Sequence, residues 1–359
     1  MIINRYILLE IIEPMVVILA VLVTLFAAYS TMHYLEDAVY GLMPGSTVMS
    51  LILLKIFISL EVLLPSTLYL SVIVGIGRLY KDGEMTALFT SGIGFTRVLM
   101  VVFALSLLVA IMVAGLSLFA RPWAYKTGYR LKAKAMADFD VTRLQAGRFY
   151  KIGGKNRVIF ITRINHKQKK ATGVFIQQNK KNNNDMLEVI YAEKARQNLS
   201  RFGGRQDILF SNGYIYEFYH TGEGDWKITK FDQLTFTLWP REITPVENKI
   251  KAASTMHLAR SHTPSGIAEL QWRFSTSLST ILLALLGVPL SRTTPRKGKY
   301  AKVIMAMLIY SFYYIISSMA KILVIQGHIP TLPGIWWVQG VLAGLLFILL
   351  LHPSQQFQP

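Results

Sequence analysis

Six apolar segments dominate this 359-residue chain, and each is long enough to cross a bilayer as a helix, which takes about 20 residues. A lipid bilayer offers no water to the backbone, so a segment of this kind must be helical. Three segments precede a long polar stretch and three follow it. We therefore predict a membrane α-helical fold with spans at Met15–Tyr34, Val48–Gly77, Val98–Phe119, Phe274–Leu290, Val303–Leu323 and Ile335–Leu351.

The composition agrees with a membrane protein that carries one separate polar part. Charged residues make up 16% of the chain, against about 25% in soluble domains, and 52% of the residues are hydrophobic. Residues 121–263 hold 26 of the 38 lysines and arginines. We expect transmembrane helices 1–3 within residues 1–120, an inserted domain at 121–265, and transmembrane helices 4–6 within 266–359.

The short loops predict the orientation of the spans. The loop that holds Arg78 and Lys81 and the loop 292–302 carry several cations, whereas the first loop on the other side holds Glu36 and Asp37. The positive-inside rule places the cationic loops in the cytoplasm. Both termini would then be cytoplasmic, and the inserted domain would lie on the opposite side of the membrane.

The inserted domain follows the two-residue alternation of β-strands. Asn212-Gly213, flanked by alternating apolar residues, predicts a hairpin turn. Short strands at this spacing are typical of a sandwich or a barrel. Its apolar interior would be either an ordinary core or a lining that holds an acyl chain. The predicted strands are Arg157–Ile164, Val174–Gln178, Leu187–Gln197, Ile208–Phe210, Tyr214–Tyr219, Trp226–Phe231 and Leu234–Trp239, and the predicted lining is Phe160, Val174, Ile176, Phe210, Ile215 and Phe218.

The chain carries no motif of an intrinsic enzyme. The phosphate-binding pattern G-x-x-x-x-G-K-[ST] is absent, and the seven histidines are scattered. The absence of cysteine excludes disulfides, cysteine zinc sites and thiol catalysis. We expect no metal or cofactor in this chain. The basic runs near Lys167 and Lys180 favour solvated loops over nucleic-acid binding, because they belong to the domain placed outside the cytoplasm.

The loop between the second and third spans predicts a short helix at about residues 82–91. Glu84 would be its polar group, and Met85, Leu88 and Phe89 would form its apolar side. Two interpretations fit this pattern equally well. The helix could lie on the lipid surface, or it could dock on a soluble ATPase and couple ATP hydrolysis to the spans.

Four charged residues fall within or at the ends of the spans, and charges in the bilayer are expensive and usually functional. Lys55 and Glu61 lie in the second span, where we expect a cavity or a contact between helices. Arg273 and Lys321 lie near the outer ends of their spans, where snorkelling toward the headgroups is expected. If Lys55, Arg273 and Lys321 face one cavity, they suit a phosphorylated amphiphile.

Small residues and a proline shape the second span. Gly75 and Gly77 would allow another helix to approach closely, and Pro65 would bend the helix.

At this point the chain resembles the lipopolysaccharide-export permeases of the LptF/LptG (YjgP/YjgQ) family over its whole length, and its first motif and last two are closer to the LptF branch. Each motif is short, and their order and spacing carry the resemblance. They are Met1-Ile2-Ile3-x-Arg5-Tyr6, Leu64-Pro65, Gly77-Arg78-Leu79-Tyr80 before Glu84, Glu269-Leu270-Gln271-Trp272-Arg273, Val288-Pro289-Leu290-Ser291 and Pro295-Arg296-x-Gly298.

The resemblance implies a permease subunit of an ABC transporter in the Gram-negative inner membrane. Its partners would be an LptG-type permease, a dimer of the ATPase LptB, which binds the ATP, and the jellyroll protein LptC. Lipopolysaccharide would leave the outer leaflet, enter a periplasmic β-jellyroll inserted between helices 3 and 4, and pass to a bridge of similar domains. Glu84 would be the coupling carboxylate, and Lys321 a basic residue near the lipid phosphates.

The chain departs from the family pattern at the outer end of the first span. Family members often carry basic residues there, whereas this chain has His33. Lys55 could compensate. Three other functions remain open: an ABC-coupled mechanotransmitter that moves no lipid, a secondary transporter, for which Glu61 is the mid-membrane carboxylate, and a membrane-anchored scaffold.

Overall fold

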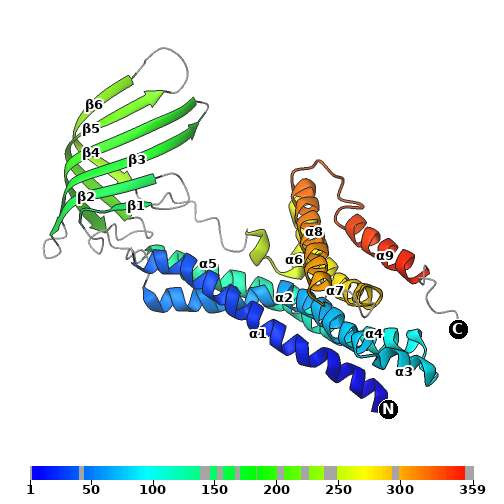
Figure 1. Ribbon diagram of the computed structural model, residues 1–359. Coiled ribbons are helices and arrows are strands. Elements are labelled where there is room, and N and C mark those ends of the chain that lie inside the picture. Colours follow the sequence, from blue (N-terminus) through cyan, green and yellow to red (C-terminus); the bar gives the residue numbers. More distant parts are fainter. Residues whose placement is uncertain are drawn as a thin grey trace. The chain divides into compact units, whose positions relative to one another are not determined.

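The chain forms two compact units, which we describe separately. One unit comprises Met1–Thr31, Ile52–Gly128 and Pro245–Pro359, and is helical; the other comprises Met32–Leu51 and Tyr129–Thr244, and contains the β-sheet. The computed structural model (Figure 1) describes residues 2–39, 44–137, 146–151, 157–165, 170–182, 184–199, 206–219, 226–237, 249–292 and 299–351.

Long apolar helices form the spans expected from the sequence. The first three are longer than expected, and the third continues through a π-helix into α5. The helices are α1 (Ile2–Val39), α2 (Gly45–Lys81), α3 (Glu84–Thr90), α4 (Phe95–Gly115), the π-helix Leu116–Ala120, α5 (Arg121–Ala137), the 3₁₀ turn η4 (Ile250–Ala252), α6 (Thr255–Ala259), α7 (Pro264–Leu290), α8 (Lys299–Ile325) and α9 (Trp336–Leu351).

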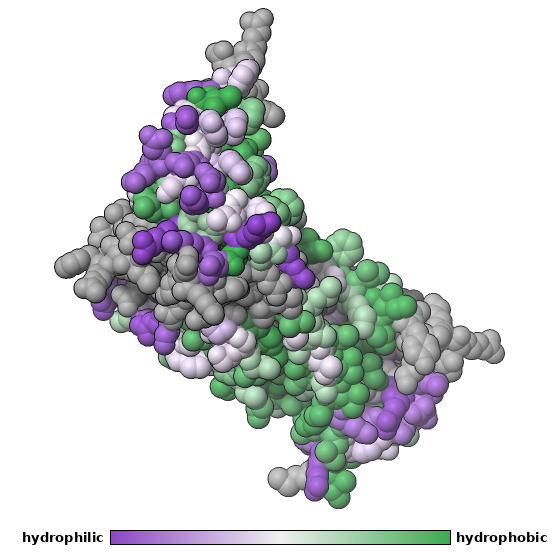
Figure 2. Space-filling view, turned by 90° about the vertical axis from the view of Figure 1, so that its left-hand side faces the viewer, coloured by the Kyte–Doolittle hydropathy of each residue, from purple (hydrophilic) through white to green (hydrophobic). Residues whose placement is uncertain are grey.

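Five stretches of the described chain are long and apolar enough to cross a membrane. The sixth apolar helix, α9, has 16 residues, which is about 24 Å at 1.5 Å per residue and less than the roughly 30 Å of a hydrocarbon core. Hydrophobic side chains cover the helices on the face seen in Figure 2. On α1 and α8, Val17 is 61% exposed and Phe312 is 63% exposed, which suits contact with lipid or with another apolar helix.

The helical unit has its core where α1, α2, α4 and α7 meet. Leu68, Val72 and Ile76 of α2 lie within it, beside Ile11 of α1. Gly75 brings α1 close to α2: an ideal Cβ built at Gly75 would lie 2.5 Å from the carbonyl oxygen of Glu10. The close approach expected at Gly75 is therefore confirmed. At Gly77 the nearest atom to such a Cβ is 3.7 Å away, so that glycine is not needed for close packing.

The expected all-β domain is confirmed, but its described strands form one antiparallel sheet. The sheet order is β1-β2-β3-β4-β5-β6, an up-and-down meander without the crossover that a sandwich or jellyroll needs (Figure 1). The strands are β1 (Phe149–Lys151), β2 (Arg157–Asn165), β3 (Lys170–Asn182), β4 (Asn184–Leu199), β5 (Gln206–Tyr219) and β6 (Trp226–Thr237).

In two places, a pair of short strands predicted from the sequence is one long strand in the structure. The hairpin predicted at Asn212-Gly213 is wrong, because both residues lie within β5, and 226–237 is likewise one strand. A Cβ at Gly213 would lie 2.2 Å from the carbonyl oxygen of Tyr191 and 2.4 Å from the ring of Phe231. The glycine thus permits close packing instead of a turn. Trp239, the predicted end of the last strand, lies outside the described residues.

A row of irregular residues crosses the sheet and changes which side chains face its core. Gly173 in β3 and Asn212 in β5 have φ angles of 64° and 53°, in the left-handed region. Strict alternation would put Ala171 and Val174, which lie on either side of Gly173, on opposite faces, yet both pack in one core. The backbone irregularity therefore resets the alternation and keeps one apolar face continuous across the sheet.

Candidate functional site

A buried charged cluster joins α2 to the π-helix and α5. Arg121, at the start of α5, donates to both carboxylate oxygens of Glu61 at 2.7 and 2.8 Å, and Ser117 donates to the same carboxylate at 2.9 Å. The side chains of Glu61 and Arg121 are 2% and 8% exposed. The π-helix also leaves the carbonyl of Leu118 able to accept a 2.6 Å hydrogen bond from Thr255 of α6. Irregular helix geometry therefore brings these polar groups together.

Glu269 of α7 extends the cluster to α8. Its Oε1 lies 3.2 Å from Nη2 of Arg121 and 3.5 Å from Nε of Arg273, and its Oε2 lies 2.5 Å from Nζ of Lys321. The ammonium of Lys321 also lies 4.8 Å from the ring centre of Trp272, within cation–π range. Two carboxylates thus face three cations, so the cluster carries a formal charge of +1.

The structure brings three of the five predicted lipid-binding residues into this cluster, namely Glu61, Arg273 and Lys321. The helix–helix contact expected for Glu61 is confirmed by Arg121. The snorkelling expected for Arg273 is wrong: its guanidinium is completely buried and bonds to Thr255 and to the carbonyl of Ala253. Arg273 is buried because the segment that contains η4 and α6 packs on α7 and offers oxygen acceptors to its guanidinium.

The other two predicted lipid-binding residues, Lys55 and His33, lie on α2 and α1. The side chain of Lys55 is half-buried. His33 is exposed and packs edge-on against the ring of Tyr34, with 5.2 Å between the ring centres. Their proposed lipid contacts stay predictions.

Sequence reasoning missed Arg121 and Glu269, which hold the cluster together. The signal for Glu269 was present, because Glu269 and Arg273 are separated by four residues, a spacing that places two side chains on one helix face. Nothing local identifies Arg121 as the partner of Glu61, because 60 residues separate them.

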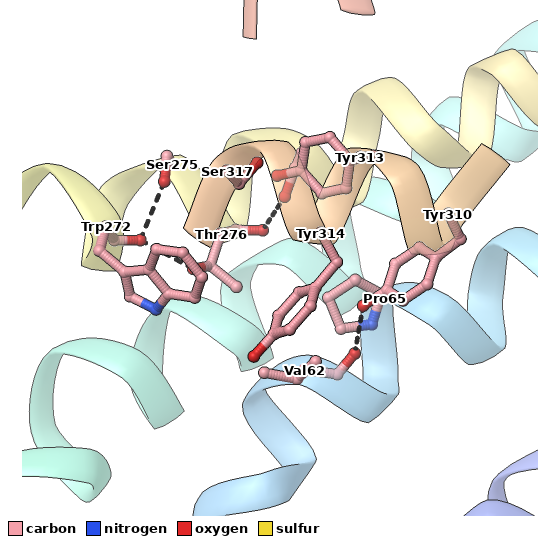
Figure 3. Close-up of a pocket in the computed structure, with 10 residues that line it drawn as sticks. Val62, Pro65, Trp272, Ser275, Thr276, Tyr310, Tyr313, Tyr314 and Ser317 are labelled. Atoms are coloured by element: carbon pink, nitrogen blue, oxygen red, sulfur yellow. Dashed lines mark hydrogen bonds between the residues drawn. The ribbon is translucent and has the colours of Figure 1, made fainter. Parts of the chain in front are cut away.

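A polar and aromatic pocket lies beside the cluster, between α2, α7 and α8 (Figure 3). Its volume for a water-sized molecule is about 20 Å³, which is room for about one water. Tyr310 of α8 donates a 2.9 Å hydrogen bond to the carbonyl of Val62, three residues before Pro65 in α2. Among the described residues, Ser317 Oγ and Trp272 Nε1 are buried and lack a hydrogen-bond partner. The contact of α8 with α2 and α7 is therefore polar, with a small gap in its packing.

The predicted short helix is α3, and its apolar side packs against the core of the helical unit. Met85 is completely buried in the helical core, and Leu88 and Phe89 pack against that core. The apolar side expected to be available for docking is thus used inside the unit. Glu84 accepts a hydrogen bond from Tyr6 of α1.

Two further pairs hold the same end of α1. Arg78 bonds to Glu10 at 2.5 and 2.9 Å, and Arg97 donates to Asn4 at 3.2 Å. The first turns of α1 are therefore tied to α2, α3 and α4. Thr86 lies on the exposed side of α3.

The sheet places the predicted lining residues on both of its faces. Val174, Ile176 and Phe210 lie in the apolar core face, and Ile215 packs against it. Phe160 pairs with Phe149, with ring centres 4.7 Å apart, and follows Ile159 of the core, so it lies on the opposite face. Phe218 is 42% exposed and lies on that opposite face too, because alternation from Ile215 puts it there. The prediction of one shared lining is wrong for Phe160 and Phe218.

No group of three or more histidine or acidic side chains that could hold a metal occurs within the described part of the chain. What the cluster does offer is a surplus positive charge at Lys321, whose side chain is 14% exposed. An amine of this kind can bind a phosphate or a carboxylate.

Comparison with known proteins identifies the family. Residues 5–352 match the family described as "Lipopolysaccharide export system permease LptF/LptG". The chain is 26% identical over 352 residues to the "Lipopolysaccharide export system permease protein LptF" of Escherichia coli (strain K12), covering 97% of this chain and 94% of that protein, and equally to the protein of that name from Shigella flexneri. Apolar helices that precede and follow the β-sheet along the chain, together with this match over nearly the whole length, show that the chain belongs to the lipopolysaccharide export permease family LptF/LptG.

Proposed function

We propose that this chain is the LptF-type permease subunit of an ABC transporter that takes lipopolysaccharide from the outer leaflet of the Gram-negative inner membrane. The observation that carries the proposal is the +1 cluster that ends at Lys321, inside helices whose outer surfaces are apolar. An amphiphile with phosphates needs both kinds of surface. Arg273 would act by holding Glu269 in place, whereas Lys321, and more remotely Lys55 and His33, would meet the lipid.

The energy would come from a separate ATPase of the LptB type, which binds ATP and docks on α3. Glu84 would pass the movement on through Tyr6, and Met85, Leu88 and Phe89 would fasten α3 to the helical core. An LptG-type permease would complete the lipid cavity, and an LptC-type protein would receive the lipid. Both termini would be cytoplasmic and the sheet periplasmic. A tagged chain purified from membranes should bring down the ATPase and the second permease, and purification of the chain alone would contradict the proposal.

We expect Tyr6→Phe to uncouple ATP hydrolysis from transport. The change removes the hydroxyl that Glu84 accepts from, so α3 can move without carrying α1. A hydrogen bond to a charged group contributes about 1.5–3 kcal/mol when shielded and less at an exposed site, so lipid released per ATP hydrolysed should fall by up to about tenfold. The measurement is lipid release and ATPase activity of the complex in vesicles. Tyr29→Phe is the control, because Tyr29 lies on the same helix and contacts only the ring of Phe26 among the described interactions. An unchanged ratio in Tyr6→Phe would contradict this coupling path.

We expect lipid to travel along the core face of the sheet, because acyl chains exposed to water cost about 0.8 kcal/mol per CH₂. Ile215 and Tyr214 are neighbours in β5 on opposite faces, with Ile215 against the apolar core and Tyr214 39% exposed. A photocrosslinking residue at 215 should capture lipopolysaccharide during ATP turnover, and one at 214 should not. Capture at 214 alone would assign the lipid to the other face. No capture at either position would favour a mechanotransmitter.

A further inference from the structure

The pair Lys321–Glu269 joins α8 to α7. Nζ of Lys321 lies 2.5 Å from Oε2 of Glu269, and the lysine side chain is 14% exposed, against 1% for the glutamate. Lys321 is therefore the member of the charged cluster that an arriving ligand can reach first. The other two cations of the cluster, Arg121 and Arg273, are 8% and 0% exposed.

The cluster can give up Lys321 without leaving a carboxylate alone. Glu269 would still face the guanidinium groups of Arg121 and Arg273, at 3.2 and 3.5 Å. The loss of Arg121 is different, because among the contacts described above Glu61 would then keep the hydroxyl of Ser117 alone. A buried carboxylate without a cation is strongly destabilising. Charge balance thus makes Lys321 the exchangeable cation of this cluster.

The packing of α8 suits such an exchange. Beside the ion pair, α8 faces the pocket of Figure 3, where Ser317 Oγ lacks a hydrogen-bond partner among the described residues. A second polar contact, from Tyr310 to the carbonyl of Val62, lies three helical turns away from Lys321. Opening the ion pair therefore removes a charged contact that fastens α8 to α7 beside a small gap in their packing.

We propose that Glu269 is a positioning residue that holds Lys321 against α7 in the empty permease and releases it to the phosphate of an amphiphile, so that lipid binding loosens α8. The inference rests on the proposed function, because it assigns a role to the same cluster. A dianionic phosphate can replace a carboxylate at an ammonium group, since it offers more charge and more acceptor oxygens. The exchange needs no proton transfer and leaves Glu269 paired with two arginines.

The test measures the distance between α7 and α8 in the assembled complex without ATP. The chain has no cysteine, so Phe274→Cys and Ile322→Cys give two unique spin-label sites, both exposed and both outside the cluster. Purified lipopolysaccharide should add a second, longer distance. The same lipid after phosphatase treatment should not add the longer distance. If inorganic phosphate alone adds it, the phosphate is sufficient without acyl chains.

Variants separate the exchange from a general loss of charge. Glu269→Gln should populate the longer distance without lipid, raising the ratio of long to short by about tenfold. Glu61→Gln is the matched control, because Glu61 contacts Arg121 but has no described contact with Lys321, and it should keep the short distance. Lys321→Met should abolish the response to lipid while the remaining four charges stay paired, so the test does not depend on how well Glu269→Gln folds.

Two outcomes overturn the inference: a distance that lipid does not change, or equal loosening in Glu61→Gln and Glu269→Gln. ATP-driven release of lipopolysaccharide by the unaltered complex is measured in parallel. If that complex releases lipid but the distance stays constant, only the exchange is wrong. If it releases no lipid at all, the proposed function itself fails.

Discussion

Replacement of Arg121 by methionine is expected to destabilise the helical unit more than any other single change described above. Arg121 is bidentate to Glu61 and also contacts Glu269, and its side chain is 8% exposed. Methionine keeps much of the volume but leaves Glu61 buried without a cation. Removal of one partner from a buried ion pair costs about 3–5 kcal/mol.

The measurement is the thermal stability of the purified complex, compared across a double-mutant cycle. Glu61→Gln should restore most of the loss in the Arg121→Met background, because the uncompensated charge is then gone. Arg130→Met is the control for arginine removal, since Arg130 is an exposed arginine on the same helix. If Arg121→Met is as stable as the unaltered chain, or if Glu61→Gln gives no recovery, the buried ion pair is not what holds α2 to α5.

The second large effect is expected from Gly75→Ala, which should push α1 away from α2. The added Cβ would lie 2.5 Å from the carbonyl oxygen and 3.1 Å from the carbonyl carbon of Glu10, and these are backbone atoms that cannot rotate aside. Overpacking of this kind costs about 1–3 kcal/mol. The shift would also strain the contacts of Glu10 with Arg78 and of Tyr6 with Glu84, because both start from the same turns of α1.

Gly77→Ala provides a matched control two residues further along α2. A Cβ there lies 3.7 Å from its nearest neighbour, and alanine favours helix over glycine by about 1 kcal/mol, so this variant should be neutral or slightly more stable. Thermal stability and lipid release per ATP hydrolysed are measured for both. Gly75→Ala should lower both quantities. Equal behaviour of the two alanine variants would contradict a tight crossing of α1 and α2 at Gly75.

The sequence predicted those residues whose role depends on a local pattern. It did not predict those whose role depends on partners far away in the chain. Apolar runs predicted the helices because burial in lipid requires a helix from every such run, whatever its neighbours. Glu61 was recognised because a charge in a span needs a partner. Its partner Arg121 was not, because only the packing of α2 against the π-helix brings the two together.

The sheet shows the same division between local and tertiary information. The two-residue alternation predicted strands throughout 157–237, but alternation alone does not say which face of a strand is buried, and Phe160 and Phe218 were predicted on the wrong face. Phe160 lies between Ile159 and Ile161, which both face the core, and Phe218 lies three residues after Ile215, so regular alternation puts both phenylalanines on the opposite face. Asn212-Gly213 looked like a turn because turns favour these residues, yet Gly213 is required by the ring of Phe231 on the next strand.

By itself, then, the sequence determined that this protein has long apolar helices before and after an inserted β domain along the chain, with one short helix in a loop and charges inside the spans. These features follow from hydrophobicity and spacing within single segments. Only the tertiary structure decided that Met85 is buried in its own core, that Arg273 is enclosed, and that Glu269 holds Lys321. Burial and ion pairing depend on which segments meet in space, and segments 50 to 60 residues apart carry no local signal of that meeting.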